Sequence, residues 1–79
     1  GTLRERALDA ANAVSLSTAA LEAAGPDRIR VSFENADSLA VYRWIEAMGR
    51  RGAYISRTAM TRVGESDLVN AEFEVAEGP

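Results

Sequence analysis

The chain has 79 residues, too few for two lobes, and a composition of 47% hydrophobic and 27% charged residues that is ordinary for one folded domain. All nine basic residues are arginine, and histidine, lysine and cysteine are absent. Their absence excludes serine nucleophiles with a histidine or lysine base, lysine-dependent phosphate loops, disulfides and common zinc sites. A net charge of −3 argues against nucleic acid as a ligand. We therefore expect no enzyme activity, no cofactor and no metal, and protein partners are favoured.

The sequence has no run of about 18 apolar residues that could cross a bilayer. Its first ten residues, GTLRERALDA, are charged and lack the apolar region of a signal peptide. They also lack an initiator methionine. We expect the chain to be a soluble piece of a longer protein, in which a membrane anchor could precede Gly1.

The first predicted element is a helix over residues 3–13. Thr2 and Glu5 have the spacing of a capping box, and apolar residues then recur every three or four positions. The next segment, VSLSTAALEA, is ambiguous. Val14, Leu16 and Thr18 alternate as in a strand, whereas TAALEAA has the composition of a helix.

A turn at Gly25-Pro26-Asp27 precedes the clearest strand, residues 28–34. Ile29, Val31 and Phe33 alternate there with charged and polar residues, a pattern typical of a half-buried strand with one polar face.

A second helix is predicted within "DSLAVYRWIEAMGRRG", residues 37–52, capped by Asn35 or Asp37. One sector of the helix is apolar, and Ala47 falls largely outside it. Leu39 lies on the polar side and is expected to pack on a flanking loop. Gly49 and Gly52 are both possible ends of the helix. The apolar sector contains Val41, Trp44, Ile45 and Met48.

Two further strands are predicted over residues 53–62 and 68–75, joined by a turn at 63–67, and the EGP tail is expected to fray. The predicted core gathers the inward residues of the clear strands and the second helix: Ile29, Val31, Phe33, Val41, Trp44, Ile45, Met48, Val69, Ala71, Phe73 and Val75.

Three features could be read as binding or catalytic sites, and each has a simpler structural interpretation. Trp44 could stack on a ligand, but its place at the flank of the apolar sector favours a core-boundary position. Arg50 and Arg51 could hold an anion, but their charges complement the helix C-terminus. Glu72 and Glu74 could form an acid pair, but a solvated sheet face is favoured.

The order of elements, together with "YRWIEAMGRRGAYI" and "GESDLVNAEFEV", resembles the periplasmic C-terminal domain of type II secretion system protein M. Val41 and Tyr42 match an apolar pair of that family, and Trp44 and Ile45 match its Trp-apolar step. Met48 and Gly52 match the following apolar and glycine positions. The alternating Val69, Ala71, Phe73 and Val75 match its last strand.

The resemblance implies an α+β fold, a circularly permuted ferredoxin-like α-β-β-α-β-β order with a four-stranded sheet and two helices on one face. It makes VSLSTAALEA the first strand, so residues 28–34 and 68–75 are expected centrally and 14–22 and 53–62 at the edges. We expect the middle pair of strands to be parallel and the other pairs antiparallel.

The resemblance further implies a single-pass protein of the bacterial inner membrane, with residues 1–79 forming one periplasmic domain. Family members help build the inner-membrane platform for protein secretion, pair with themselves as homodimers and bind protein L of the same system. The expected role is therefore a non-catalytic scaffold. A periplasmic domain of a type IV pilus platform protein and a small-ligand regulatory module of ferredoxin-like fold remain alternatives.

The first edge segment is the expected contact for a second copy or for protein L. It has no charge from Val14 to Leu21, and charges are what usually protect an edge strand from foreign pairing. The edge at 53–62 carries Arg57 and Arg62. The predicted contact residues are Val14, Leu16, Thr18 and Leu21.

Overall fold

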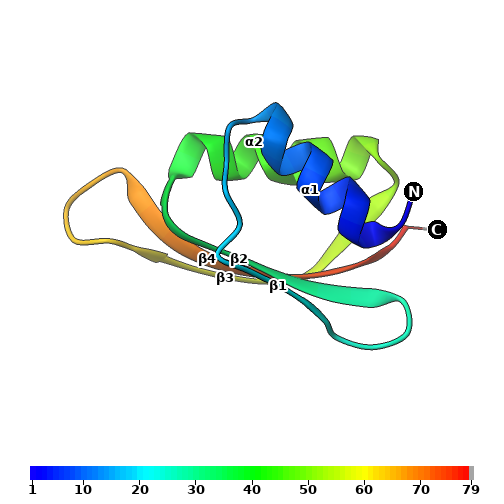
Figure 1. Cartoon of the computed structure of the whole chain (residues 1–79). Coiled ribbons are helices and arrows are strands. Elements are labelled where there is room, and N and C mark those ends of the chain that lie inside the picture. Colours follow the sequence, from blue (N-terminus) through cyan, green and yellow to red (C-terminus); the bar gives the residue numbers. More distant parts are fainter. Residues whose placement is uncertain (79) are drawn as a thin grey trace.

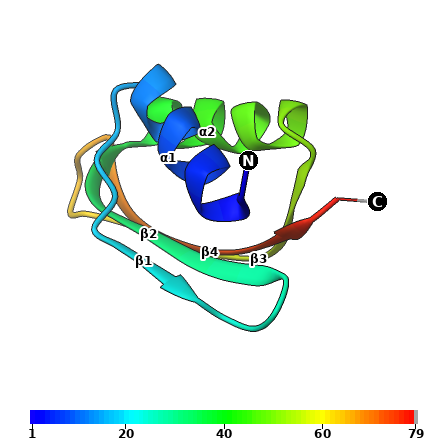
Figure 2. The same ribbon diagram turned by 45° about the vertical axis from the view of Figure 1, so that its right-hand side comes forward.

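Two helices lie side by side across one face of a four-stranded sheet in the computed structural model, which describes residues 1–78 (Figures 1 and 2). The observed order is the predicted α-β-β-α-β-β, and the α+β, permuted ferredoxin-like fold class is confirmed. Pro79, the last residue of the EGP tail, lies outside the described residues. In chain order the elements are α1 (Leu3–Ala13), β1 (Ala20–Ala23), β2 (Arg28–Asp37), α2 (Ser38–Arg50), β3 (Ala53–Arg62) and β4 (Leu68–Glu77).

The start of α1 is fixed by the predicted capping box. The Thr2 hydroxyl accepts a hydrogen bond from the Glu5 backbone N–H at 3.1 Å, and the Glu5 carboxylate accepts one from the Thr2 N–H at 3.1 Å. Two of the amides that a helix leaves unpaired at its start are thereby satisfied. The helix covers the predicted residues.

The first strand is much shorter than predicted and begins later. Residues 14–19 form no strand, and only Ala20–Ala23 pair with β2. The N–H groups of Val14 and Leu16 both donate to the Ala11 carbonyl, which turns the chain back at the end of α1. The apolar alternation at Val14 and Leu16 therefore belongs to a loop whose side chains pack against the core. The helix-forming composition of ALEA is overridden by pairing with β2.

All neighbouring strands are antiparallel, in the order β1-β2-β4-β3, so the expectation of a parallel middle pair is wrong. The crossover through α2 brings β3 back parallel to β2, and the β3–β4 turn then reverses the chain. Because β4 and not β3 lies next to β2, the middle pair is antiparallel. The predicted division into central and edge strands is confirmed.

β2 and α2 follow one another without a loop. β2 continues past the predicted end to Asp37, through an irregularity between Phe33 and Ala36 in which Asn35 has a φ of +48°. Asp37 then caps α2, its carboxylate accepting the Ala40 N–H at 3.0 Å.

The exposed and buried sides of α2 differ from the prediction at two residues. Leu39 is 55% exposed and not packed on a loop, because the helical rotation that turns Val41 inward turns Leu39 away from the sheet. Ala47 is buried, because α1 packs beside α2 and covers a second strip of that helix.

The core lies between the sheet and the two helices, and all predicted core residues are buried except Ile45, which is half-buried. Trp44 is at its centre, fully buried, so the boundary position expected for it is wrong. Its ring centroid lies 5.1 Å from those of both Phe33 and Phe73. Its indole Nε1–H donates to the Ala7 carbonyl at 3.1 Å, which ties α2 to α1.

Candidate partner-binding surfaces

The polar side chains of the described residues lie at the surface of the domain. Among residues 1–78 no group of acidic side chains could hold a metal ion, and no polar side chain is buried. The candidate surfaces are a charged cluster at one end of the fold, the open face of the sheet and two hollows.

One charged cluster with shifted pKa values joins the two ends of the fold. Arg6 of α1 donates from Nη1 to the Arg51 carbonyl at 3.0 Å and from Nη2 to the Glu77 carboxylate at 2.6 Å. The hydrogen bond lowers the pKa of Glu77 and raises the pKa of Arg6. The cluster links α1, the end of α2 and the end of β4, so its role is structural. The expectation that the tail frays from Glu77 onward is therefore wrong at Glu77, which belongs to β4 and is bonded to Arg6.

The arginine doublet lies at the end of α2, where Arg50 is the last helical residue and Arg51 is used by the fold. Arg51 donates from Nη1 to the Ala47 carbonyl at 3.1 Å, so its guanidinium satisfies the last turn of the helix. Gly52 follows in a left-handed conformation, with a φ of +77°, that favours glycine.

The sheet face away from the helices is polar and charged. Glu74 pairs with Arg28 at 3.3 Å, and Glu72 lies 3.9 Å from Arg30. The two glutamates thus belong to cross-strand ion pairs and not to an acid pair, and the predicted solvated face is confirmed.

The four predicted contact residues lie on the β1 side of the molecule but do not form one strand. Val14 and Leu16 line a hollow of about 460 Å³ between the α1–β1 loop and the start of α2. Leu21 belongs to β1, and Thr18 lies between them in the loop. All four are half-buried.

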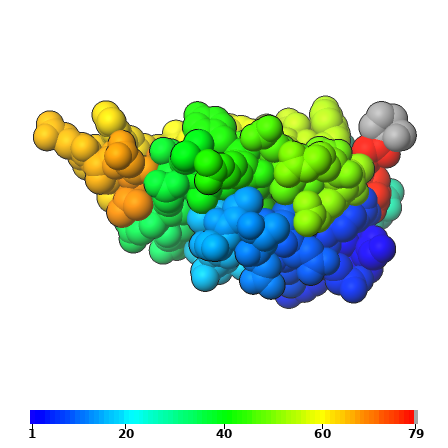
Figure 3. All heavy atoms as spheres, turned by 90° about the horizontal axis from the view of Figure 1, so that it is seen from above, coloured from blue at the N-terminus to red at the C-terminus, as the bar shows by residue number. Residues whose placement is uncertain are grey.

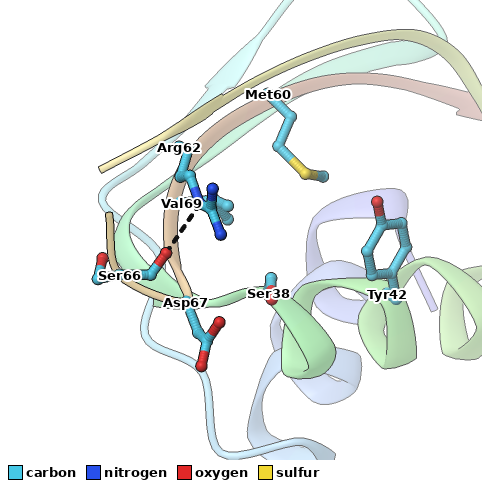
Figure 4. Close-up of a pocket in the computed structure, with 7 residues that line it drawn as sticks. All are labelled: Ser38, Tyr42, Met60, Arg62, Ser66, Asp67 and Val69. Carbon is cyan, nitrogen blue, oxygen red and sulfur yellow. Dashed lines mark hydrogen bonds between the residues drawn. The ribbon is translucent and has the colours of Figure 1, made fainter. Parts of the chain in front are cut away.

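A second hollow, of about 430 Å³, lies between α2 and the β3–β4 hairpin and was not anticipated (Figure 4). Met60 points from β3 toward α2, and Tyr42 rises from α2 toward the strand. Arg62 closes one end, its Nε donating to the Ser66 carbonyl at 3.1 Å. The available sequence signal was Tyr42, an aromatic residue just outside the core sector of its helix.

No helix in residues 1–78 has the length and apolar character needed to cross a membrane.

One comparison with known proteins identifies a family. The sequence model described as type II secretion system protein M matches residues 3–77. The chain has no significant match among curated protein sequences. Among solved structures it is similar to the periplasmic domain of EpsM from Vibrio cholerae, with a TM-score of 0.81 and 13% identity over 98% of this chain and 100% of that one, a likeness that shows the fold. Because the family match spans almost the whole sequence, the chain belongs to the type II secretion system protein M family.

Proposed function

We propose that this chain is the periplasmic domain of a single-pass inner-membrane protein and a non-catalytic structural component of the type II secretion platform, which supports protein export across the outer membrane. The observation that carries the proposal is the family match over residues 3–77. The similarity to a periplasmic domain supports the location. A structural role also accords with the use of charged side chains within the fold. Glu5 and Arg51 cap helices, and Arg6 joins α1 to the end of α2.

The proposed partners are a second copy of the chain, giving a homodimer, and the periplasmic domain of protein L. The proposed contact is the β1 side, with Val14, Leu16, Thr18 and Leu21. Glu22 is the only charged residue between positions 14 and 24, so this side is weakly protected against association.

The geometry of β1 limits how this contact can form. The Ala24 N–H donates to the Arg28 carbonyl at 3.0 Å. Because pairing alternates along an antiparallel ladder, Leu21 and Ala23 turn their backbone N–H and C=O groups outward. The free edge thus offers few backbone groups, and the loop side chains supply the rest of the contact. The association should be weak, because so short an edge buries little beside a standard interface of roughly 1,600 Å².

Sedimentation equilibrium of the chain, alone and mixed with the periplasmic domain of protein L, tests this contact. Thr18→Arg adds a charge to the loop, and Ala23→Pro removes an outward N–H without breaking a bond to β2. Both should weaken association by about threefold or more. For self-association, Thr58→Pro on the opposite edge strand is the matched control. Association that is unchanged by both β1 variants, while circular dichroism stays native, would refute the contact.

A further inference from the structure

The outer side of β3 is the longer free edge of the sheet. β3 pairs only with β4 and has 10 residues, whereas the opposite edge strand, β1, has 4. The Val63 N–H donates to the Leu68 carbonyl at 2.9 Å. Every second residue back from Val63, as far as Arg57, therefore turns its N–H and C=O groups toward β4. The residues between them, including Thr58 and Met60, turn these groups away from β4. The edge therefore presents unpaired backbone groups to a further strand.

The charge of β3 itself is positive, and one acidic residue, Asp67, lines the hollow next to it. β3 contains Arg57 and Arg62 and no acidic residue. Arg57 lies opposite Glu74 in the ladder, but the Glu74 carboxylate pairs with Arg28. Within residues 1–78 neither Arg57 nor Arg62 takes part in an ion pair. The Arg57 guanidinium and the Nη groups of Arg62, whose Nε donates to the Ser66 carbonyl, are thus available to carboxylates from outside.

The hollow described above lies on the same edge. Figure 3 shows part of β3 emerging beyond α2 on the side away from α1. Tyr42 is 56% exposed and Met60 is half-buried, so an apolar and aromatic wall stands next to the backbone groups of the strand. A strand added to β3 would place every second side chain over this wall and the others on the charged open face.

We infer that the β3 edge receives an extended acidic segment of a different protein chain by strand addition. The backbone of the segment pairs with the outward groups of Thr58 and Met60. Its apolar side chains cover Tyr42 and Met60, and its acidic side chains on the open face meet Arg57. A carboxylate at the end of the segment meets Arg62. This mode takes affinity from backbone hydrogen bonds and selectivity from alternate side chains.

Charge decides between a foreign segment and a second copy. Two β3 strands paired with each other would gather the arginines of both copies along one ladder without any carboxylate in either strand. An acidic segment instead neutralises Arg57 and Arg62. The inference is independent of the contact proposed at β1, because the two edges lie on opposite sides of the sheet.

The test uses a fluorescein-labelled peptide of four Glu-Val repeats with blocked ends, titrated with the chain at low salt and followed by anisotropy. Two control peptides replace glutamate with lysine or methylate the backbone nitrogen of every second residue. We expect the Glu-Val peptide to bind and to shift the amide resonances of Thr58 and Met60. We expect the lysine and methylated peptides to bind at least about fivefold more weakly.

Variants of the chain locate the site. Thr58→Pro should weaken binding at least about fivefold, and Arg57→Glu by about three- to tenfold, whereas Ala23→Pro on the other edge should not change it. If Thr58→Pro unfolds the chain, Arg57→Glu and the methylated peptide still show whether the peptide binds at the β3 edge. Equal binding of all three peptides, the absence of binding at millimolar concentration, or self-association lost in Thr58→Pro would overturn the inference.

Discussion

Replacing Trp44 with phenylalanine should reveal how much of the stability depends on one side chain. Trp44 is fully buried, contacts Phe33 and Phe73, and donates its indole N–H to the Ala7 carbonyl. The substitution removes about two buried ring carbons, worth ~0.8 kcal/mol each. The lost hydrogen bond adds about 1 kcal/mol. The free energy of unfolding should therefore fall by about 2 to 3 kcal/mol.

Urea unfolding followed by far-UV circular dichroism measures this loss without relying on the fluorescence of the residue that is removed. In a domain of this size the loss corresponds to a fall in melting temperature of roughly 10–20 °C. Tyr54→Phe is the matched control, because Tyr54 is 54% exposed and its change should stay within about 0.5 kcal/mol. A loss below about 0.5 kcal/mol for Trp44→Phe would show that the α1–α2 contact does not depend on the indole.

Three further predictions concern the backbone, pH and metals. Gly52→Ala, at a φ of +77°, should destabilise the chain by about 1 kcal/mol, whereas Gly49→Ala, in open helical surroundings, should stabilise it by about 0.5 to 1 kcal/mol; equal effects in thermal melts would contradict the assignment. Because Arg6 lowers the pKa of Glu77, their contribution to stability should be present above pH 4.5, the ordinary carboxyl value, and be lost as the pH falls through the folded-state pKa. In thermal melts across that range, the melting temperature of Glu77→Gln should fall less with decreasing pH than that of the unsubstituted chain. The same pH profile in both would count against the ion pair. Micromolar Zn²⁺, Mg²⁺ or Ca²⁺ should leave the melting temperature unchanged, and a rise of several degrees would reveal a metal site.

Local signals were enough to predict most of the elements. The capping box places the start of α1. The alternation around Val31 and Phe73 identifies the two central strands, because apolar and polar side chains alternate along a strand with one solvent-exposed face. The core sector of α2 was visible for the same reason, through its helical period. The full burial of Trp44 was not predicted, because it depends on contact with α1. The periodicity of α2 alone carries no information about that contact.

The features that the sequence did not reveal are set by partners distant in the chain. Val14 and Leu16 alternate like a strand, but which residues pair is decided by β2, which meets only Ala20–Ala23. The antiparallel middle pair, in contrast, follows from the predicted neighbours themselves, because a crossover through α2 and one hairpin turn leave residues 28–34 and 68–75 running in opposite directions. The hollow at β3 joins Tyr42 and Met60 from separate elements, so no short motif encodes it. The availability of Arg57 likewise depends on Glu74 being taken by Arg28.

The cluster of Arg6, Arg51 and Glu77 also brings the two ends of the domain together. It keeps the beginning of α1 and the end of β4 at one end of the molecule, as Figure 1 shows for these two elements. A short flexible linker from Gly78 to Thr2 could therefore close the chain into a ring. Opening that ring at the β3–β4 turn, beside Gly64, would give the order β-α-β-β-α-β with every strand pair retained apart from the turn itself. The unpermuted ferredoxin-like arrangement is thus one ligation and one cut away from this sequence.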